Sequence, residues 1–305
     1  MVEITKDLFE PIGEDENSSE AINRPSITYW QDAWRRLKMN KVAMIGLVLL
    51  AIFTLMAVFA PYMTKYTYNQ NNLDFVNQLP NKDHWFGTDG LGRDLWARVW
   101  MGARVSLFIG LAAAVIETFI GVVVGGLSGY LGGRTDMFVM RFIDILIAVP
   151  DLIFIILIMV IIGAGIAPII IAFALTGWLR MARLVRGQVL QIKEQEFVLA
   201  AKTLGADTMR LVFRHLIPNT LGVIIVTLTM AVPGAIFYEA FLSFIGIGIK
   251  PPLASWGQLA SSGAKVLQVY PYQLIIPAIF ISLTMLSLNL LGDGLRDALD
   301  PKLRK

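Results

Sequence analysis

One acidic residue lies in the middle of an otherwise apolar stretch of this sequence, where a charge is costly to bury. Glu117 stands inside residues 105–130, whose other members are all uncharged. An ionisable side chain at such depth in a membrane is by default a functional candidate that faces the helix bundle or a polar cavity. The alternative is a buried carboxyl group that is hydrogen-bonded to a neighbouring span. Asp144 follows Arg141 by three residues, which predicts a structural ion pair on one helix face.

The sequence shows no residue set with the spacing of a catalytic or nucleotide-binding site. It contains no cysteine and two histidines, His84 and His215, which are too far apart to suggest a histidine metal site. It also has no G-x-x-x-x-G-K-[ST] phosphate loop and no serine or histidine arrangement typical of a hydrolase. We therefore expect a protein that is not an enzyme, holds no metal, and takes its energy from a partner protein or an ion gradient.

The composition predicts an all-α protein that crosses a membrane several times. Of the 305 residues, 56% are hydrophobic, and the mean hydropathy is +0.63. Several apolar segments approach the ~20 residues that a helix needs to cross a bilayer. The six predicted transmembrane helices are residues 42–60, 105–130, 138–162, 166–179, 220–241 and 272–291. Pro150, Pro233 and Pro277 interrupt three of these segments and predict kinks.

The positive charges predict how the chain is oriented. With the N-terminus inside, the inner segments next to the membrane carry seventeen Lys and Arg residues, and the outer segments carry seven. Because such residues gather on the cytoplasmic side, both termini are predicted to be cytoplasmic. Residues 1–28 are acidic and without periodicity, which predicts a flexible tail with no signal-peptide layout. Residues 29–41 are basic and aromatic, as in an interfacial helix before the first span.

A basic, amphipathic stretch between two apolar segments, residues 196–219, predicts two short helices joined by a sharp turn. Phe197, Val198, Ala201 and Leu204 recur at helical spacing before Gly205, which suits a left-handed helix end. Asp207 or Thr208 is the expected cap of a second helix with Leu211, Val212 and Leu216 on one side, and Pro218 marks the next boundary. Such a helix pair forms a knob that fits a partner's groove. The alternative is an amphipathic helix lying on the membrane surface.

This stretch resembles the cytoplasmic "EAA" loop with which the permease subunits of ABC importers dock onto their ATPase. Leu199 stands where the family's pattern has the loop's glutamate, and Glu196 lies about one turn earlier. The resemblance implies an ATPase-coupling loop within residues 180–219. Its expected contact residues are Glu196, Ala200, Ala201, Gly205, His215, Pro218 and Asn219.

A glycine-rich motif in the predicted outer loop narrows the resemblance. The sequence HWFGTDGLGRDLWARV begins at His84, and its Gly and Asp residues favour a compact turn held by side-chain-to-backbone hydrogen bonds. A turn of this kind needs no ligand. The motif resembles the oligopeptide and dipeptide branch of ABC permeases, in particular its C-type subunits, and the likeness extends to the C-terminal GDGLRDALDPKLRK. The motif residues are Gly87, Thr88, Asp89, Gly92, Arg93 and Asp94.

The resemblance implies a six-helix, type I (MetI-like) importer permease in the bacterial cytoplasmic membrane, surrounded by lipid and without nucleic acid. Expected partners are a second, homologous permease subunit, two ATP-binding subunits that hold ATP and Mg²⁺, and an extracytoplasmic peptide-binding protein; this chain would bind no cofactor. The implied substrate is an oligopeptide. Alternatives are a dipeptide or nickel importer of the same family, and a secondary transporter. Glu239, near the outer mouth, either holds a peptide's amino end or caps the bundle.

The expected division of the chain follows from these features. Residues 1–28 are the acidic tail, 29–60 the interfacial helix with the first span, and 61–103 an extracytoplasmic loop. Residues 104–292 form the core permease domain, and 293–305 form a cytoplasmic tail.

Overall fold

Helices account for all the regular structure in the described part of the chain, which confirms the all-α prediction. The computed structural model describes residues 28–300, so nearly all of the predicted acidic tail and the end of the predicted C-terminal tail lie outside it. The helices are α1 (Tyr29–Met39), α2 (Lys41–Phe59), α3 (Leu95–Leu131), α4 (Gly133–Ile147), α5 (Asp151–Ile162), α6 (Ile166–Thr176), α7 (Trp178–Ile192), α8 (Glu196–Thr203), α9 (Thr208–Arg210), α10 (Ile217–Phe244), α11 (Trp256–Ala264) and α12 (Tyr272–Leu299). Short 3₁₀ turns occur at Ala60–Tyr62 and Leu73–Phe75, and a π-helical turn, η5, at Leu211–Leu216.

Among residues 28–300, five continuous helical stretches are long and apolar enough to cross a membrane, and a bent pair supplies a sixth candidate. The bent pair is α4 and α5, which meet at 83°. Pro150 directly precedes α5; it has no backbone N–H and disfavours a helical conformation in the residue before it. The predicted span 138–162 is therefore broken at this proline. Pro233 and Pro277 lie inside α10 and α12, which continue through them.

Several helices extend beyond the apolar segments that predicted them. The helix α3 begins at Leu95, where the carboxylate of Asp94 accepts a hydrogen bond from the Ala97 N–H at 2.9 Å. The helix α12 continues to Leu299, through the start of the predicted C-terminal tail. Hydropathy marks the part of a helix suited to lipid, whereas capping and packing decide where the helix ends. The fourth span likewise continues from α6 into α7.

A row of glycines four residues apart lets α3 lie close against α7. A Cβ atom at Gly125 would overlap the backbone carbonyl of Ala182, and one at Gly121 would overlap the side chain of Met181. Gly129 continues the row one turn further along α3. Small residues at this spacing allow two helix backbones to approach closely in a membrane. The contact therefore holds α7, and the segment that follows it, against the longest helix of the bundle.

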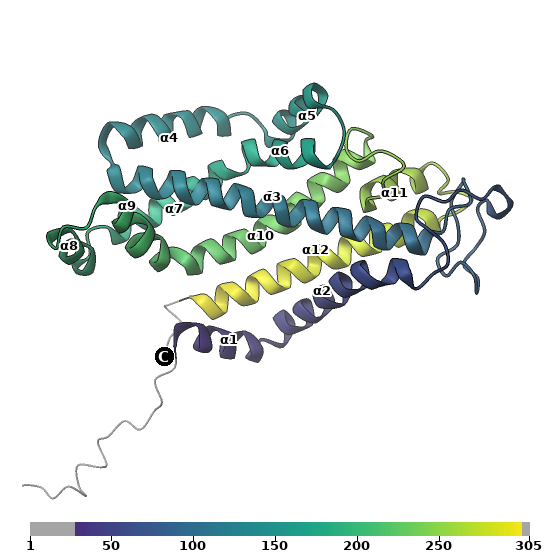
Figure 1. Ribbon diagram of the computed structural model, residues 1–305, viewed down its shortest axis with the longest axis horizontal. Coiled ribbons are helices and arrows are strands. Elements are labelled where there is room, and N and C mark those ends of the chain that lie inside the picture. The colour runs from purple at the N-terminus through teal and green to yellow at the C-terminus, as the bar shows by residue number, and fades with distance from the viewer. Residues whose placement is uncertain (1–27, 301–305) are drawn as a thin grey trace, which may run out of the picture.

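The helices form an elongated bundle with different structures at its two ends (Figure 1). At one end lie α8, α9, α1 and the C-terminal end of α12, and at the other lie α11 and the loop between α2 and α3. The hydroxyl group of Tyr29 donates to the Leu299 carbonyl at 3.3 Å, which ties α1 to the end of α12. Ile45, Ile52 and Leu55 on the outer face of α2 are exposed, as expected for a helix in contact with lipid.

Candidate functional site

The stretch predicted to dock onto a partner projects from one end of the bundle (Figure 1). We call residues 196–219 the knob. Its first helix, α8, ends in a Schellman motif. The Gly205 N–H donates to the Lys202 carbonyl at 3.0 Å, and the Ala206 N–H donates to the Ala201 carbonyl at 3.1 Å. Gly205 has a φ of +86°, which confirms the predicted left-handed turn.

Asp207 begins the second helical segment of the knob, as the sequence predicts. Its carboxylate accepts a hydrogen bond from the Arg210 N–H at 3.0 Å. Leu211, Val212 and Leu216 are buried, so the predicted apolar side faces the rest of the bundle. This packing fixes the direction in which the knob projects.

The second segment is not a separate short helix. It continues from Thr208 through η5 into α10, and Pro218 lies in the first turn of α10, near the predicted point of entry into the membrane. A proline has no backbone N–H to donate within a continuous helix, and here the wider hydrogen-bond spacing of the π-helical turn η5 directly precedes it. The side chain of Asn219 donates to the His215 carbonyl at 2.6 Å. The knob is thus joined directly to a membrane-spanning helix.

The outer face of the knob presents apolar side chains that the sequence analysis did not identify as surface residues. Leu204 is 88% exposed, whereas Val198 in the same predicted apolar pattern is buried. The exposed set is Phe197, Leu199, Leu204, Met209 and Phe213. Among the predicted contact residues, Glu196, Ala200, Gly205, Pro218 and Asn219 are exposed, and Ala201 and His215 are half-buried. The knob therefore projects a surface on which exposed apolar side chains lie among charged ones such as Lys202 and Arg210.

Three arginines spaced three residues apart on α7 each pair with an aspartate of α4 or α5. The pairs are Arg180–Asp151, Arg183–Asp144 and Arg186–Asp136. Arg186 uses both Nε and Nη2, and Ser128 also donates to Asp136 at 2.7 Å. The prediction that Asp144 pairs with Arg141 is wrong, because packing brings Arg183 of α7 to 2.6 Å from the Asp144 carboxylate. This ion-pair row attaches the bent pair to the helix that leads to the knob.

Glu117 lines a cavity of about 270 Å³ between α3, α5, the α6–α7 stretch and α10. The Asp151–Arg180 ion pair, Thr227 and Tyr238 line the same cavity. The side chain of Glu117 is half-buried, and no hydrogen bond or ion pair joins its carboxylate to another residue in the range 28–300. It lies against Gly177, where a Cβ atom would overlap the carboxylate. This geometry favours the cavity-facing alternative over a carboxyl group hydrogen-bonded to a neighbouring span.

Glu239 is completely buried and does not line the Glu117 cavity. Its carboxylate accepts hydrogen bonds from the hydroxyl groups of Ser106 at 2.7 Å and Ser243 at 2.8 Å. Ser243 in turn accepts a hydrogen bond from the Ile249 N–H at 2.9 Å. These bonds join α3, the end of α10 and the loop that follows it. The geometry supports a cap on the bundle, because no atom of the carboxylate is open to a ligand.

The glycine-rich motif of the predicted outer loop forms a buried polar network at the end of the bundle opposite the knob. The carboxylate of Asp89 accepts from the backbone N–H groups of Leu91 at 2.9 Å and Arg93 at 3.1 Å, and it pairs with the Arg93 guanidinium at 2.8 Å. Asp94 caps α3 and also lies 2.8 Å from Nδ1 of His84. The compact turn held by side-chain-to-backbone bonds is confirmed.

The same motif is fastened to the first turn of α12. Gly87 and Gly92 have φ angles of +75° and +68°, and added Cβ atoms would overlap neighbouring backbone at both positions. The carbonyl of Thr88 accepts hydrogen bonds from the Tyr272 hydroxyl at 2.9 Å and from Nε2 of Gln273 at 3.1 Å. The motif thus holds the first turns of α3 and α12 together.

Comparison with known proteins identifies the family. The model of the family described as "Binding-protein-dependent transport system inner membrane component" matches residues 121–305. The chain belongs to this family. The "N-terminal TM domain of oligopeptide transport permease C" matches residues 28–80.

Relatives of this transport-system family cover nearly the whole chain. The oligopeptide transport system permease protein OppC of Bacillus subtilis is 54% identical over 305 residues, all of both chains. The dipeptide transport system permease protein DppC of the same organism is 53% identical over 96% of this chain and 92% of its own. OppC of Escherichia coli is 43% identical over 94% of this chain and 96% of its own. The protein is an integral inner-membrane permease subunit of an ABC importer, with the MetI-like fold.

Two structural features of this permease were missed at the sequence level, although each has a periodic signal. Gly121, Gly125 and Gly129 recur every four residues, the small-residue spacing of close helix packing. The arginines of α7 recur every three residues, but they were counted only among the positive charges that predict the orientation of the chain in the membrane. Their aspartate partners lie 29 to 50 residues away in the chain, so no local pattern connects the two sets.

Proposed function

We propose that this permease translocates oligopeptides across the cytoplasmic membrane as one of two homologous permease subunits of an ABC importer. The match of residues 28–80 to the N-terminal domain of oligopeptide permease C supports this substrate class. A full-length relative at 54% identity, named for oligopeptide transport, also supports it. Dipeptides are the second candidate, because a relative at 53% identity is named for dipeptide transport.

The observation that carries the proposal is the projecting apolar face of the knob. Apolar side chains gathered on a protruding element indicate a protein interaction site. This chain has no phosphate loop of its own, so the proposed partner is the ATP-binding subunit of the importer. Each of two such subunits would hold ATP and Mg²⁺ and receive the knob of one permease. Closure of the ATP sites would then move α7 and α10, to which the knob is directly joined.

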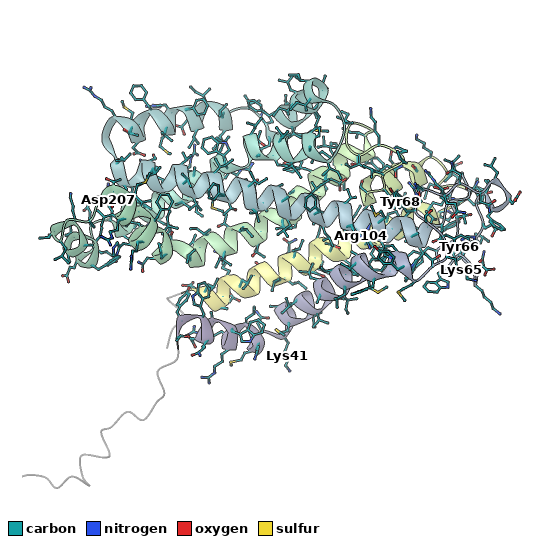
Figure 2. All side chains as sticks on the ribbon, in the orientation of Figure 1. Lys41, Lys65, Tyr66, Tyr68, Arg104 and Asp207 are labelled. Atoms are coloured by element: carbon teal, nitrogen blue, oxygen red, sulfur yellow. The ribbon has the colours of Figure 1, made fainter. Side chains whose placement is uncertain are left out.

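The opposite end of the bundle is the proposed receiving face for an extracytoplasmic peptide-binding protein. Figure 2 places Asp207 of the knob at one end of the molecule, and Lys65, Tyr66 and Tyr68 at the other. With the knob in the cytoplasm, where ATP is, the loop that carries these three residues faces outside. Both termini would then be cytoplasmic, which agrees with the distribution of positive charge.

Reconstitution of the importer in proteoliposomes tests the proposal. The assembly would contain this chain, the second permease, both ATP-binding subunits and the binding protein, supplied with a labelled pentapeptide. We expect uptake only when ATP and every component are present, and no ATP binding or hydrolysis by this chain alone. ATP turnover by the purified chain, free of contaminants, would reject this division of labour. Uptake of a labelled dipeptide but not of the pentapeptide would favour the second candidate.

A further inference from the structure

We propose that the Glu117 cavity is a subsite that binds the protonated amino end of the transported peptide. The inference rests on the proposed function, because it concerns the path that a peptide takes through this subunit. The cavity lies among three membrane-spanning stretches and α5 of the bent pair, and Glu117 enters it from α3.

The balance of charge in the cavity selects a cation. Three charged side chains line it, and two of them, Asp151 and Arg180, form an ion pair with each other. Glu117 is left as the carboxylate without an ion-pair partner within residues 28–300. A carboxylate accepts hydrogen bonds and donates none, and its strongest partners are charged N–H groups. The missing partner of Glu117 is therefore a ligand that carries N–H donors and a positive charge.

Peptides of every sequence offer such a group at one end. A carrier that accepts many different peptides must recognise what they share, namely the α-ammonium group, the backbone amides and the terminal carboxylate. The ammonium group supplies three N–H donors and one positive charge. Tyr238 adds an aromatic ring to the cavity lining, and aromatic rings attract cations.

The size of the cavity also fits an end of a peptide. Its volume of about 270 Å³ lies below the range of ~300–1,000 Å³ typical of pockets that enclose a whole drug-sized ligand. The site therefore has room for the first part of a peptide and not for a complete pentapeptide. Gly177 is needed beside Glu117, because a larger residue there would occupy the position of the carboxylate.

The test compares a pentapeptide that has a free amino end with its N-acetylated form in the reconstituted importer. The affinity of the binding protein for each peptide is measured first. Each peptide is then supplied with enough binding protein to saturate transport. In the wild-type complex we expect the free peptide to enter about tenfold faster than the acetylated one. This ratio corresponds to the loss of an interaction of about 1.4 kcal/mol when the amino end is acetylated. Glu117→Gln should slow the free peptide about tenfold and leave the acetylated peptide within about twofold, so that the preference disappears.

A second variant and a second measurement check that the effect belongs to the cavity. Gly177→Ala keeps the carboxylate but fills its place, and it should reproduce the loss of preference.

A photoreactive benzoyl group on the first residue of the pentapeptide should crosslink to cavity residues such as Met230 in the wild-type complex. The crosslink should fall about tenfold in Glu117→Gln. Asp293→Asn makes the same change from carboxylate to amide at an exposed position outside the cavity and should keep the wild-type preference.

The outcomes separate this subsite from the proposed function. If Glu117→Gln transports both peptides with the wild-type preference, or slows both equally, the subsite is wrong and peptide import stands. If the wild-type complex transports the two forms at the same rate, the subsite is also wrong. A wild-type complex that takes up no peptide at all, although fully assembled and supplied with ATP, overturns the proposed function and the subsite with it.

Discussion

At the scale of single residues, two glutamates within apolar helices have different surroundings and different roles. Glu239 has hydrogen-bond donors on α3 and α10 and no exposed surface, so its carboxylate joins structural elements. Glu117 has no such partners in the described chain and faces a cavity. Donors offset the cost of burying a carboxylate, whereas an intramembrane carboxylate without them is a candidate functional site. The role of each residue therefore follows from its neighbours.

The first prediction concerns the turn of the knob. A β-branched side chain at Gly205, where φ is +86°, is strained by ~1–3 kcal/mol. No atom lies within 4 Å of an added Cβ, so the strain comes from the backbone alone. Gly205→Val should insert into the membrane and assemble with the second permease, but it should tilt the knob and abolish uptake of the labelled pentapeptide. Ala200→Asp should also abolish uptake, because it places a charge on the exposed face.

Gly246 provides a control with matched backbone strain. Its φ is +85°, and no atom lies within 4 Å of a Cβ added there. It follows the C-terminal end of α10, whereas the knob precedes the N-terminal end of that helix. Gly246→Val should insert into the membrane in the same amount as Gly205→Val, while the ATP-binding subunits still copurify with the complex. Near-normal uptake by Gly205→Val and Ala200→Asp at normal abundance would show that the knob is not the coupling element.

At the scale of elements, α7 connects the features on which the proposed coupling depends. It packs against the glycine row of α3, carries the three arginines of the ion-pair row, and contributes Arg180 and Met181 to the cavity. It ends at Ile192, shortly before the knob begins. A displacement of the knob would therefore reach the bent pair α4–α5 through α7, and it would reach the cavity through both α7 and α10.

The second prediction tests the close contact between α3 and α7. Gly125→Ala should destabilise the folded chain by about 1–3 kcal/mol, because the new methyl group overlaps the backbone carbonyl of Ala182, which no change of rotamer can move. Gly187→Ala is the matched control on α7, where nothing lies within 4 Å of an added Cβ. It should be neutral or stabilise by about 0.5–1 kcal/mol, since alanine favours a helix. Thermal unfolding midpoints in a mild detergent measure both; equal midpoints would contradict the contact.

At the scale of the whole molecule, the two ends of the bundle are built for different surroundings. The knob exposes apolar side chains on short helices, whereas the outer loop buries its polar side chains in a network fastened to α3 and α12. The exposed apolar side chains of the knob suit a protein partner that covers them. The buried polar network makes the loop at the other end rigid. The proposed importer places the ATP-binding subunits at the first end and the peptide-binding protein at the second.

The third prediction concerns the orientation of the bundle. A reporter fused near Asn77 should behave as external, and one near Lys193 should behave as internal, because the larger count of positive residues lies on the side of the knob. Protease accessibility in intact cells and in inverted vesicles gives an independent measurement. The reverse pattern would place the knob outside the cell, away from ATP, and would contradict coupling through it.

Local preferences and hydropathy allowed much of this structure to be predicted from the sequence. The apolar segments predicted the membrane-spanning helices, Gly205 predicted a left-handed turn, Asp207 a helix cap, and the glycines at 87 and 92 a compact loop. Each of these depends on a residue and its near neighbours, so a short window of sequence contains the information. The family resemblance likewise relied on short motifs, and the comparisons confirm it.

Only the tertiary structure decided how distant segments meet. It paired Asp144 with Arg183 of another helix, enclosed Glu239 between serines of α3 and α10, and left Glu117 facing a cavity. The size of the 83° bend at Pro150 and the direction of the knob also came from packing. Burial, ion pairing and cavities depend on atoms far apart in the chain. Hydropathy and spacing along the sequence describe each helix by itself, so they could not select among its possible partners.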